Sequence, residues 1–129
     1  MACSDETHVV PWMTLVAIST SVVFVPGGEW FDANRLTAGK AYGEVVGRNG
    51  NAQAVPAIQL TNDPHDPSNG STTAMNVAIT ANGVFDPDQE HAISSGAFKY
   101  ARCGWNVSLT TGSTLATMTA MGVFQLGRG

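Results

Sequence analysis

Five residues that could hold a metal ion lie together in the segment 61–73, TNDPHDPSNGSTT. They are Asn62, Asp63, His65, Asp66 and Asn69. Oxygen-rich sets of this kind suit calcium, but the D-x-[DN]-x-[DN]-G spacing of a calcium loop is absent, and no Glu stands at its twelfth position. Pro64 and Pro67 interrupt the segment, and Asp-Pro and Asn-Gly pairs are common in turns. We therefore expect a structural loop here and no metal site.

A second acidic run contains Asp86, Asp88 and Glu90 beside His91. It suggests the carboxylate pair of a glycoside hydrolase. Such carboxylates are held about 5 to 9.5 Å apart on opposite sides of a sugar ring, by different elements of a rigid scaffold. Three acids within one polar connection give no such geometry, so we interpret the run as a solvated loop.

The His and Cys residues are not spaced for zinc binding or nucleophilic catalysis. The sequence has no H-x-x-x-H pair, no C-x-x-C pair and no G-x-S-x-G elbow. Cys3 and Cys103 are expected to be unrelated reduced thiols, since a bridge would have to pin the N-terminal segment to the sheet. The sequence thus predicts no catalytic residue, no metal and no cofactor, and we expect that the protein is not an enzyme.

Aromatic residues are the remaining candidates for recognition. Trp105 stands in an alternating segment and is expected in the core. Trp30 and Phe31 are adjacent, so a strand there would point one ring inward and the other outward. Packing or subunit contact is the more frequent use of such rings, and sugar stacking is the alternative. Trp12, Trp30 and Phe31 are therefore the candidate partner-interface residues.

Charge is scarce in this chain of 129 residues. Charged residues make up 12%, about half of the roughly 25% of an ordinary soluble domain, and the net charge is −4. The basic residues are scattered, which argues against nucleic acid. The apolar segment 9–25 follows Asp5 and Glu6 and contains Pro11, so it predicts neither a signal peptide nor a membrane helix. Weakly charged surfaces of this kind suit burial against protein neighbours.

The periodicity of the sequence predicts strands and no helices. Strands are expected in segments 12–25, 29–34, 41–48, 52–60, 75–80, 97–109 and 114–126. About eight strands with frequent turn signals indicate an all-β fold, an antiparallel β-sandwich of the jelly-roll type. We expect a single domain of residues 12–129, preceded by an extended N-terminal arm of residues 1–11. Deletion of that arm should leave the fold intact and weaken attachment to a partner.

Two hairpins are expected within this sandwich. Asn49-Gly50-Asn51 would join segments 41–48 and 52–60, and the turn 110–113 would join 97–109 and 114–126. Pro56 indicates an edge strand or a bulge. The predicted core residues are Leu15, Val45, Val77, Ile79, Trp105, Val107, Leu109 and Leu115.

Three stretches carry a family resemblance. Segment 46–70, VGRNGNAQAVPAIQLTNDPHDPSNG, looks like a hairpin followed by a Q-x-S/T-N-D loop, and segment 98–124, FKYARCGWNVSLTTGSTLATMTAMGVF, looks like a closing hairpin. Segment 15–31 resembles the opening strands of the same architecture. Together they are similar to the small jelly-roll or β-sandwich proteins of tailed-phage capsids known as decoration or cement proteins.

The resemblance implies a structural protein on the outer capsid surface of a virion, assembled in the host cytoplasm. Such a protein would form a homotrimer, bind the major capsid protein and bridge neighbouring capsomers, without nucleic acid or membrane. Modest contacts acting together would then resist the pressure of packaged DNA. The alternative is a receptor- or glycan-binding β-sandwich module of a phage head or tail fibre, in which Trp12 and Trp30 would contact the sugar.

Overall fold

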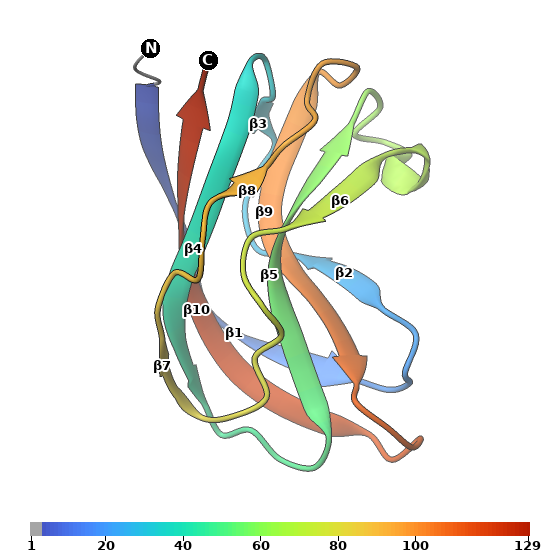
Figure 1. Ribbon diagram of the computed structural model, residues 1–129. Helices are drawn as coiled ribbons and strands as arrows, with labels where there is room; N and C mark the ends of the chain where they lie inside the picture. The colour runs from blue at the N-terminus through green and yellow to red at the C-terminus, as the bar shows by residue number, and fades with distance from the viewer. Residues whose placement is uncertain (1–3) are drawn as a thin grey trace.

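The computed structural model describes the backbone of residues 4–129 and side chains from Glu6 onward. It consists of two antiparallel sheets packed face to face (Figure 1). Sheet A has the order β1 (Ser4–Ala17), β10 (Ala116–Arg128), β4 (Leu36–Val46) and β7 (Gly83–Phe85), with β8 (His91–Ala92) also paired to β4. Sheet B has the order β2 (Val23–Pro26), β9 (Tyr100–Leu109), β5 (Ala52–Thr61) and β6 (Ser71–Ala74), with β3 (Phe31–Asp32) also paired to β9. A short 3-10 helix, η1 (Pro67–Asn69), precedes β6.

The predicted all-β sandwich of two antiparallel sheets is confirmed. The described residues form ten strands, where about eight were expected, because β6, β7 and β8 lie outside the expected segments. The expected strand 75–80 is absent, and that segment contributes an isolated bridge between Ile79 and Ala54 instead. No helix within residues 4–129 is long and apolar enough to span a membrane.

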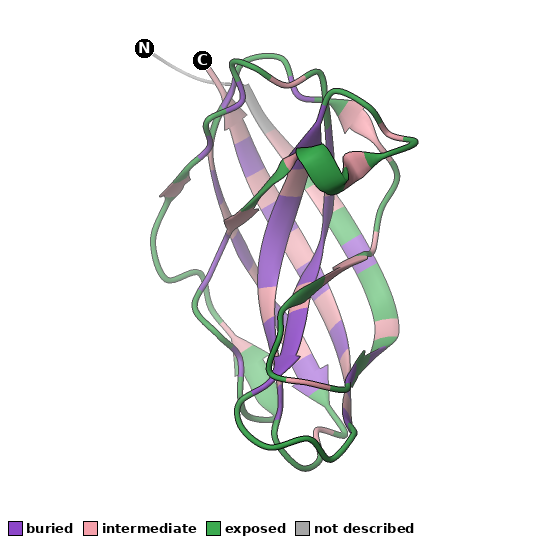
Figure 2. Cartoon of the chain, turned by 90° about the vertical axis from the view of Figure 1, so that its right-hand side faces the viewer, coloured by how far each residue is buried: buried purple, intermediate pink, exposed green. Residues whose placement is uncertain are grey.

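Alternation of buried and less buried residues explains why the long strands form where they do. In β10 the side chains of Met118, Phe124 and Leu126 point into the core, and the intervening Thr119, Met121 and Gln125 point outward. Figure 2 shows the same banding of buried and partly exposed positions along the strands. The core lies between the two sheets, with Trp105 and Phe124 as its largest fully buried side chains.

Six of the eight predicted core residues are buried: Leu15, Val45, Ile79, Trp105, Val107 and Leu109. The prediction is wrong for Val77 and Leu115, which are 60% and 59% exposed. Val77 lies outside the strands, between Met75 and Ile79, which are the residues of this segment that hydrogen-bond to β5. Leu115 precedes β10, whose first inward residue is Ala116.

The two predicted hairpins are wrong, although the strands themselves are present. Strand β4 belongs to sheet A and β5 to sheet B, while β9 belongs to sheet B and β10 to sheet A. Both connecting turns therefore carry the chain from one sheet to the other. Long-range pairs replace the hairpins, because β1 pairs with β10 and β2 pairs with β9.

The N-terminal arm is a further correction. Residues 4–11 form the first part of β1, which pairs with β10 from Ser4 opposite Arg128 to Ala17 opposite Ala116. The register shifts between Val10 and Met13, so Pro11 lies in a bulge on an edge strand, where its missing N–H is tolerated. Residues 1–3 lie outside the described part of the chain, and the expectation for Cys3 lies there with them.

Pro56 lies in an interior strand, since β5 runs between β9 and β6. Pairing with β6 extends from Ala57 to Leu60, so Pro56 stands just past the point where this ladder ends. Its carbonyl still accepts a hydrogen bond from the N–H of Met75, at 2.7 Å. A proline is tolerated in β5 because the neighbouring strand stops beside it.

Candidate binding surfaces

The polar loop that suggested calcium is held together by its own side chains. Asp63 accepts a hydrogen bond from the N–H of His65 (3.0 Å), and Asp66 accepts one from the hydroxyl of Ser68 (2.6 Å). Asn62 donates to the carbonyl of Ala97 at 2.7 Å. Within residues 4–129, no group of three or more His, Cys, Asp or Glu side chains is placed to hold a metal ion.

The second acidic run is divided among separate contacts. Asp88 pairs with His91, at 3.0 Å between Oδ1 and Nε2. Asp86 accepts through its backbone carbonyl, from the amide of the buried Asn76, which also donates to the carbonyl of Ala41. Glu90 lines a hollow on sheet A that is described below. These contacts hold the connection between β7 and β8 against the sandwich.

The Cys103 thiol is buried inside the sandwich between the two sheets. Burial, together with the negative charge of Glu6, raises the pKa of Cys103 to about 12. The thiol therefore stays protonated at neutral pH, whereas a nucleophilic cysteine needs its thiolate form.

Trp30 and Phe31 come together in the structure, beside the edge strand β1. Both line a hollow with the β1 residues 7–10 and the glycine at position 28. The Phe31 ring stacks on His8, with 4.1 Å between ring centroids, and packs against the core. The Trp30 ring instead carries the guanidinium of Arg102, at 4.1 Å from the ring centroid.

Trp12 lies elsewhere. It stands in the β1 bulge, at the level of Met121 on β10, with 49% of its surface exposed. It does not line the hollow formed by Trp30 and Phe31. The structure thus groups two of the three candidate interface residues and leaves the third on a different surface.

The outer face of sheet A carries a set of apolar side chains from all four strands. We define this apolar belt as Val9, Trp12, Tyr42, Val46, Val84, Met121 and Val123. The strand register places Val9 beside Val123, and Val123 beside Tyr42. Val84 and Met121 flank Glu44 on either side. Val84 is 74% exposed and Val9 is 59% exposed, so the belt is open to a partner.

The belt could not be found from the sequence, because it depends on pairings between distant segments. Residues 9 and 123 become neighbours through the pairing of β1 with β10, and residues 42 and 123 through that of β10 with β4. The sequence signal that existed was the outward phase of Tyr42, Glu44 and Val46. This alternation shows which way the three side chains point, but it does not show which side chains of other strands lie beside them.

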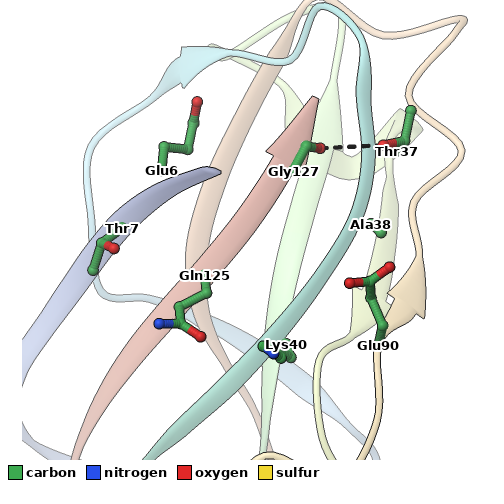
Figure 3. A pocket seen from close by; sticks show the side chains of 8 residues that line it. All are labelled: Glu6, Thr7, Thr37, Ala38, Lys40, Glu90, Gln125 and Gly127. Atoms are coloured by element: carbon green, nitrogen blue, oxygen red, sulfur yellow. Dashed lines mark hydrogen bonds between the residues drawn. The ribbon is translucent and has the colours of Figure 1, made fainter. Parts of the chain in front are cut away.

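A polar hollow of about 220 Å³ adjoins the belt on the same face (Figure 3). Thr7, Gln125 and Lys40 come from three neighbouring strands, and Glu90 comes from the connection before β8. The hydroxyl of Thr37 donates to the carbonyl of Gly127 at its rim. The outer face of sheet A therefore has a polar end, which contains the hollow, and an apolar part, which is the belt.

A second group of exposed apolar residues surrounds the turn between β1 and β2. We call it the turn cluster, and it consists of Ile18, Val22 and Val23, which are between 55% and 63% exposed. Val16, which is 47% exposed, lies beside Thr117 on the outer face of sheet A and belongs to that face. The carbonyl of Ser19 in this turn accepts a hydrogen bond from the N–H of Leu109, which anchors the turn to β9. The turn cluster is a different surface from the belt.

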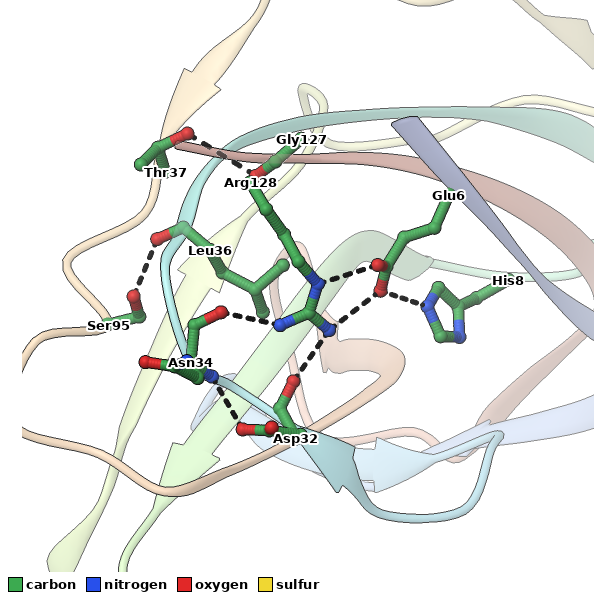
Figure 4. Close-up of polar contacts among 9 residues, drawn as sticks. All are labelled: Glu6, His8, Asp32, Asn34, Leu36, Thr37, Ser95, Gly127 and Arg128. Atoms are coloured by element: carbon green, nitrogen blue, oxygen red, sulfur yellow. Dashed lines mark hydrogen bonds and ion pairs between the residues drawn. The ribbon is translucent and has the colours of Figure 1, made fainter. Parts of the chain in front are cut away.

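A charged clamp fixes the start of β1 to the end of β10 (Figure 4). Arg128 contacts both carboxylate oxygens of Glu6, at 2.7 and 3.0 Å, and donates to the carbonyls of Asp32 and Asn34. The hydrogen bond from Arg128 holds the pKa of Glu6 below its ordinary value, against the effect of burial. His8 contacts the same carboxylate at 2.8 Å. This clamp explains how the polar start of the chain becomes part of a strand.

Comparison of the chain with protein families, curated proteins and solved structures finds no match.

Proposed function

We propose that the protein is a structural virion subunit, which decorates and stabilises an icosahedral phage capsid by bridging neighbouring capsomers as a homotrimer. The observation that carries this proposal is the apolar belt on the outer face of sheet A. Large exposed apolar patches on soluble domains mark surfaces that bind other proteins. The major capsid protein and further copies of the chain are the proposed partners.

The strand order supports the resemblance to decoration proteins. Sheet A runs β1-β10-β4-β7 and sheet B runs β2-β9-β5-β6. This order results when eight strands, paired first to last as one long antiparallel hairpin, are rolled into two sheets. It is the arrangement of a jelly roll, and we infer that fold type for the chain.

The size of the face also suits a stable protein contact. Three long strands about 4.8 Å apart, and the eleven residues of β4 at about 3.4 Å each, span roughly 14 by 37 Å, or about 500 Å², and the three residues of β7 extend this area. A standard interface buries about 800 Å² on each partner. The outer face of sheet A is therefore large enough to form most of such an interface.

The presence of two separate apolar surfaces supports a cyclic trimer. Subunits of a trimer contact each other head to tail, so each copy must present two unlike patches. The belt on sheet A and the turn cluster between β1 and β2 are two such patches. A two-fold dimer, in contrast, would need one self-complementary patch.

Quantitative mass spectrometry of purified virions tests this function. We expect the chain in many copies per particle, in proportion to the number of capsomers. A handful of copies per virion would contradict a decorating role and would place the protein at a unique vertex, a fibre or the tail.

A second candidate is a glycan-binding module of a head or tail fibre, and a specific observation favours it. Trp30 and Phe24 are partly exposed on either side of Arg102 on the outer face of sheet B, and sugars commonly contact aromatic rings placed beside polar groups in this way. Glycan-array binding that is lost in Trp30→Ala would support this candidate. An array without any binding would exclude it.

A further inference from the structure

Arg102 is fixed on the outer face of sheet B by three contacts. Its Nε–H donates to Oε1 of Gln59 on the neighbouring strand β5, at 2.8 Å. Its guanidinium lies 4.1 Å from the centroid of the Trp30 ring and 5.8 Å from that of Phe24. The guanidinium is thus oriented before any ligand arrives, which reduces the entropy that binding must overcome.

The outer edge of this guanidinium has no hydrogen-bond acceptor among the residues that the structure describes. Among the contacts within residues 4–129, the Arg102 side chain donates from Nε alone, and no carboxylate forms an ion pair with it. Partial burial lowers the pKa of Arg102, because the rings remove part of its water. The two terminal amino groups therefore form a free fork of donors that carries a positive charge.

A carboxylate is the group that this fork fits best. Arginine binds carboxylates through two parallel hydrogen bonds, which adds geometric specificity to the charge attraction. A phosphate would fit the fork as well, but sheet B offers no second cation within reach of Arg102 along its register. Gln59 lies opposite Arg102 on β5, and Trp30 lies against it on the other side.

The groups around Arg102 point to a sugar as the carrier of that carboxylate. Asn106 lies beside Phe24 on β2 and beside Val55 on β5. Farther along the face, Gln53 and Ser108 hydrogen-bond to each other at 2.9 Å. Neutral amides and hydroxyls beside aromatic rings suit a ligand that combines hydroxyl groups with an apolar ring face.

We propose that the outer face of sheet B binds an acidic oligosaccharide, whose carboxylate pairs with Arg102 and whose sugar rings contact Trp30 and Phe24. This inference deepens the glycan-binding candidate and does not depend on capsid decoration. The two sheets pack face to face, so their outer faces point in opposite directions (Figure 1). A copy that is attached through the belt would keep its sheet B face open.

Isothermal titration calorimetry with the intact chain tests the proposal. The probes are a tetrasaccharide of alternating glucuronic acid and N-acetylglucosamine, and the neutral tetrasaccharide of N-acetylglucosamine. We expect the acidic probe to bind at least about tenfold more tightly. Arg102→Gln should weaken its binding by about tenfold or more, which corresponds to about 1.4 kcal/mol.

Two further variants distinguish the contribution of the planar guanidinium from that of positive charge alone. Arg102→Lys keeps the charge but loses the planar fork, so we expect it to weaken binding as well. Lys99→Gln removes one positive charge from an exposed position three residues before Arg102 in the sequence and should leave binding unchanged. Thermal unfolding of each variant checks its fold, and Arg102→Lys carries the test if Arg102→Gln does not fold.

The outcomes distinguish this inference from the function that it deepens. Equal binding of both probes, or binding that survives in both Arg102 variants, would overturn the role of Arg102 and leave glycan binding in place. Absence of binding to either probe would overturn both. Tighter binding of tetraglutamate than of the acidic sugar would also overturn the proposal, because it would indicate a protein carboxylate as the ligand.

Discussion

Trp105 has two opposing effects on the stability of the core. Its ring is fully buried, meets the edge of Phe85 at 6.1 Å between centroids, and lies close against the backbone of Gly122. Its indole N–H, however, has no hydrogen-bond acceptor among the described residues. An unpaired buried donor costs about 1 to 3 kcal/mol, which offsets part of the gain from burying the ring.

Replacement of Trp105 separates these two effects. Trp105→Ala should lower the free energy of unfolding by about 3 to 5 kcal/mol, because it leaves a large cavity. Trp105→Phe should cost clearly less, because it keeps an aromatic ring and removes the unpaired N–H. Urea denaturation of both variants measures the difference. A near-neutral Trp105→Ala, or two equal losses, would contradict this account.

Glu6 links the stability of the fold to pH. Arg128 lowers the pKa of Glu6 in the folded chain from an ordinary value of 4.5. The ionised form therefore stabilises the fold fully above that value, and this contribution is lost as the pH falls through the lowered, folded-state pKa. The difference in melting temperature between the wild type and Glu6→Gln should be largest near neutral pH and should shrink below pH 4.5. A difference that does not change with pH would argue against the clamp.

At the scale of elements, alternation could be predicted from the sequence, whereas pairing could not. The inward phase of Ala101, Cys103, Trp105 and Val107 is visible in the sequence and is correct. The turn after β4 contains Asn49-Gly50-Asn51, which is equally suited to a hairpin and to a corner between two sheets. A hairpin and a corner differ only in the strands with which β4 and β5 pair, and those strands are distant in the sequence.

The first strand was missed for a related reason. Its polar start becomes a strand because Arg128, at the opposite end of the chain, neutralises Glu6, and because Phe31 covers His8. Neither partner can be identified from the N-terminal residues themselves. The same limit applied to the candidate interface residues. Trp30 was chosen because it is aromatic, but Arg102, which lies over its ring, could not be identified from the sequence.

Removal of residues 1–10 is therefore expected to destabilise the fold, contrary to the expectation for a free arm. The deletion removes Val10, which is fully buried, and uncovers the β10 edge beside Phe124 and Leu126. Loss of Val10 alone should cost about 1.5 to 3 kcal/mol. Removal of residues 1–3 is the matched control and should change the melting temperature little. Equal melting temperatures of the two truncated chains would contradict the assignment of β1.

At the scale of the whole molecule, the two outer faces differ in chemistry. Sheet A presents the apolar belt with Glu44 among its side chains, and sheet B presents aromatic rings, amides and one guanidinium. The low charge of the sequence predicted a surface suited to contact with protein, and the belt is where such contact is proposed. Which sheet carries the contact could not be predicted, because each face is assembled from four separate segments.

The most direct test of the proposed assembly is the mass of the chain in solution, measured by sedimentation velocity. We expect the wild type to sediment at three times its 13.5 kDa mass. Val84→Lys places a charge in the belt opposite Glu44, where the fold tolerates it, and should give monomers. Val77→Lys changes another exposed valine, which lies outside the belt, and should remain trimeric. A monomeric wild type, or a Val84→Lys variant that still forms trimers, would contradict the role of the belt.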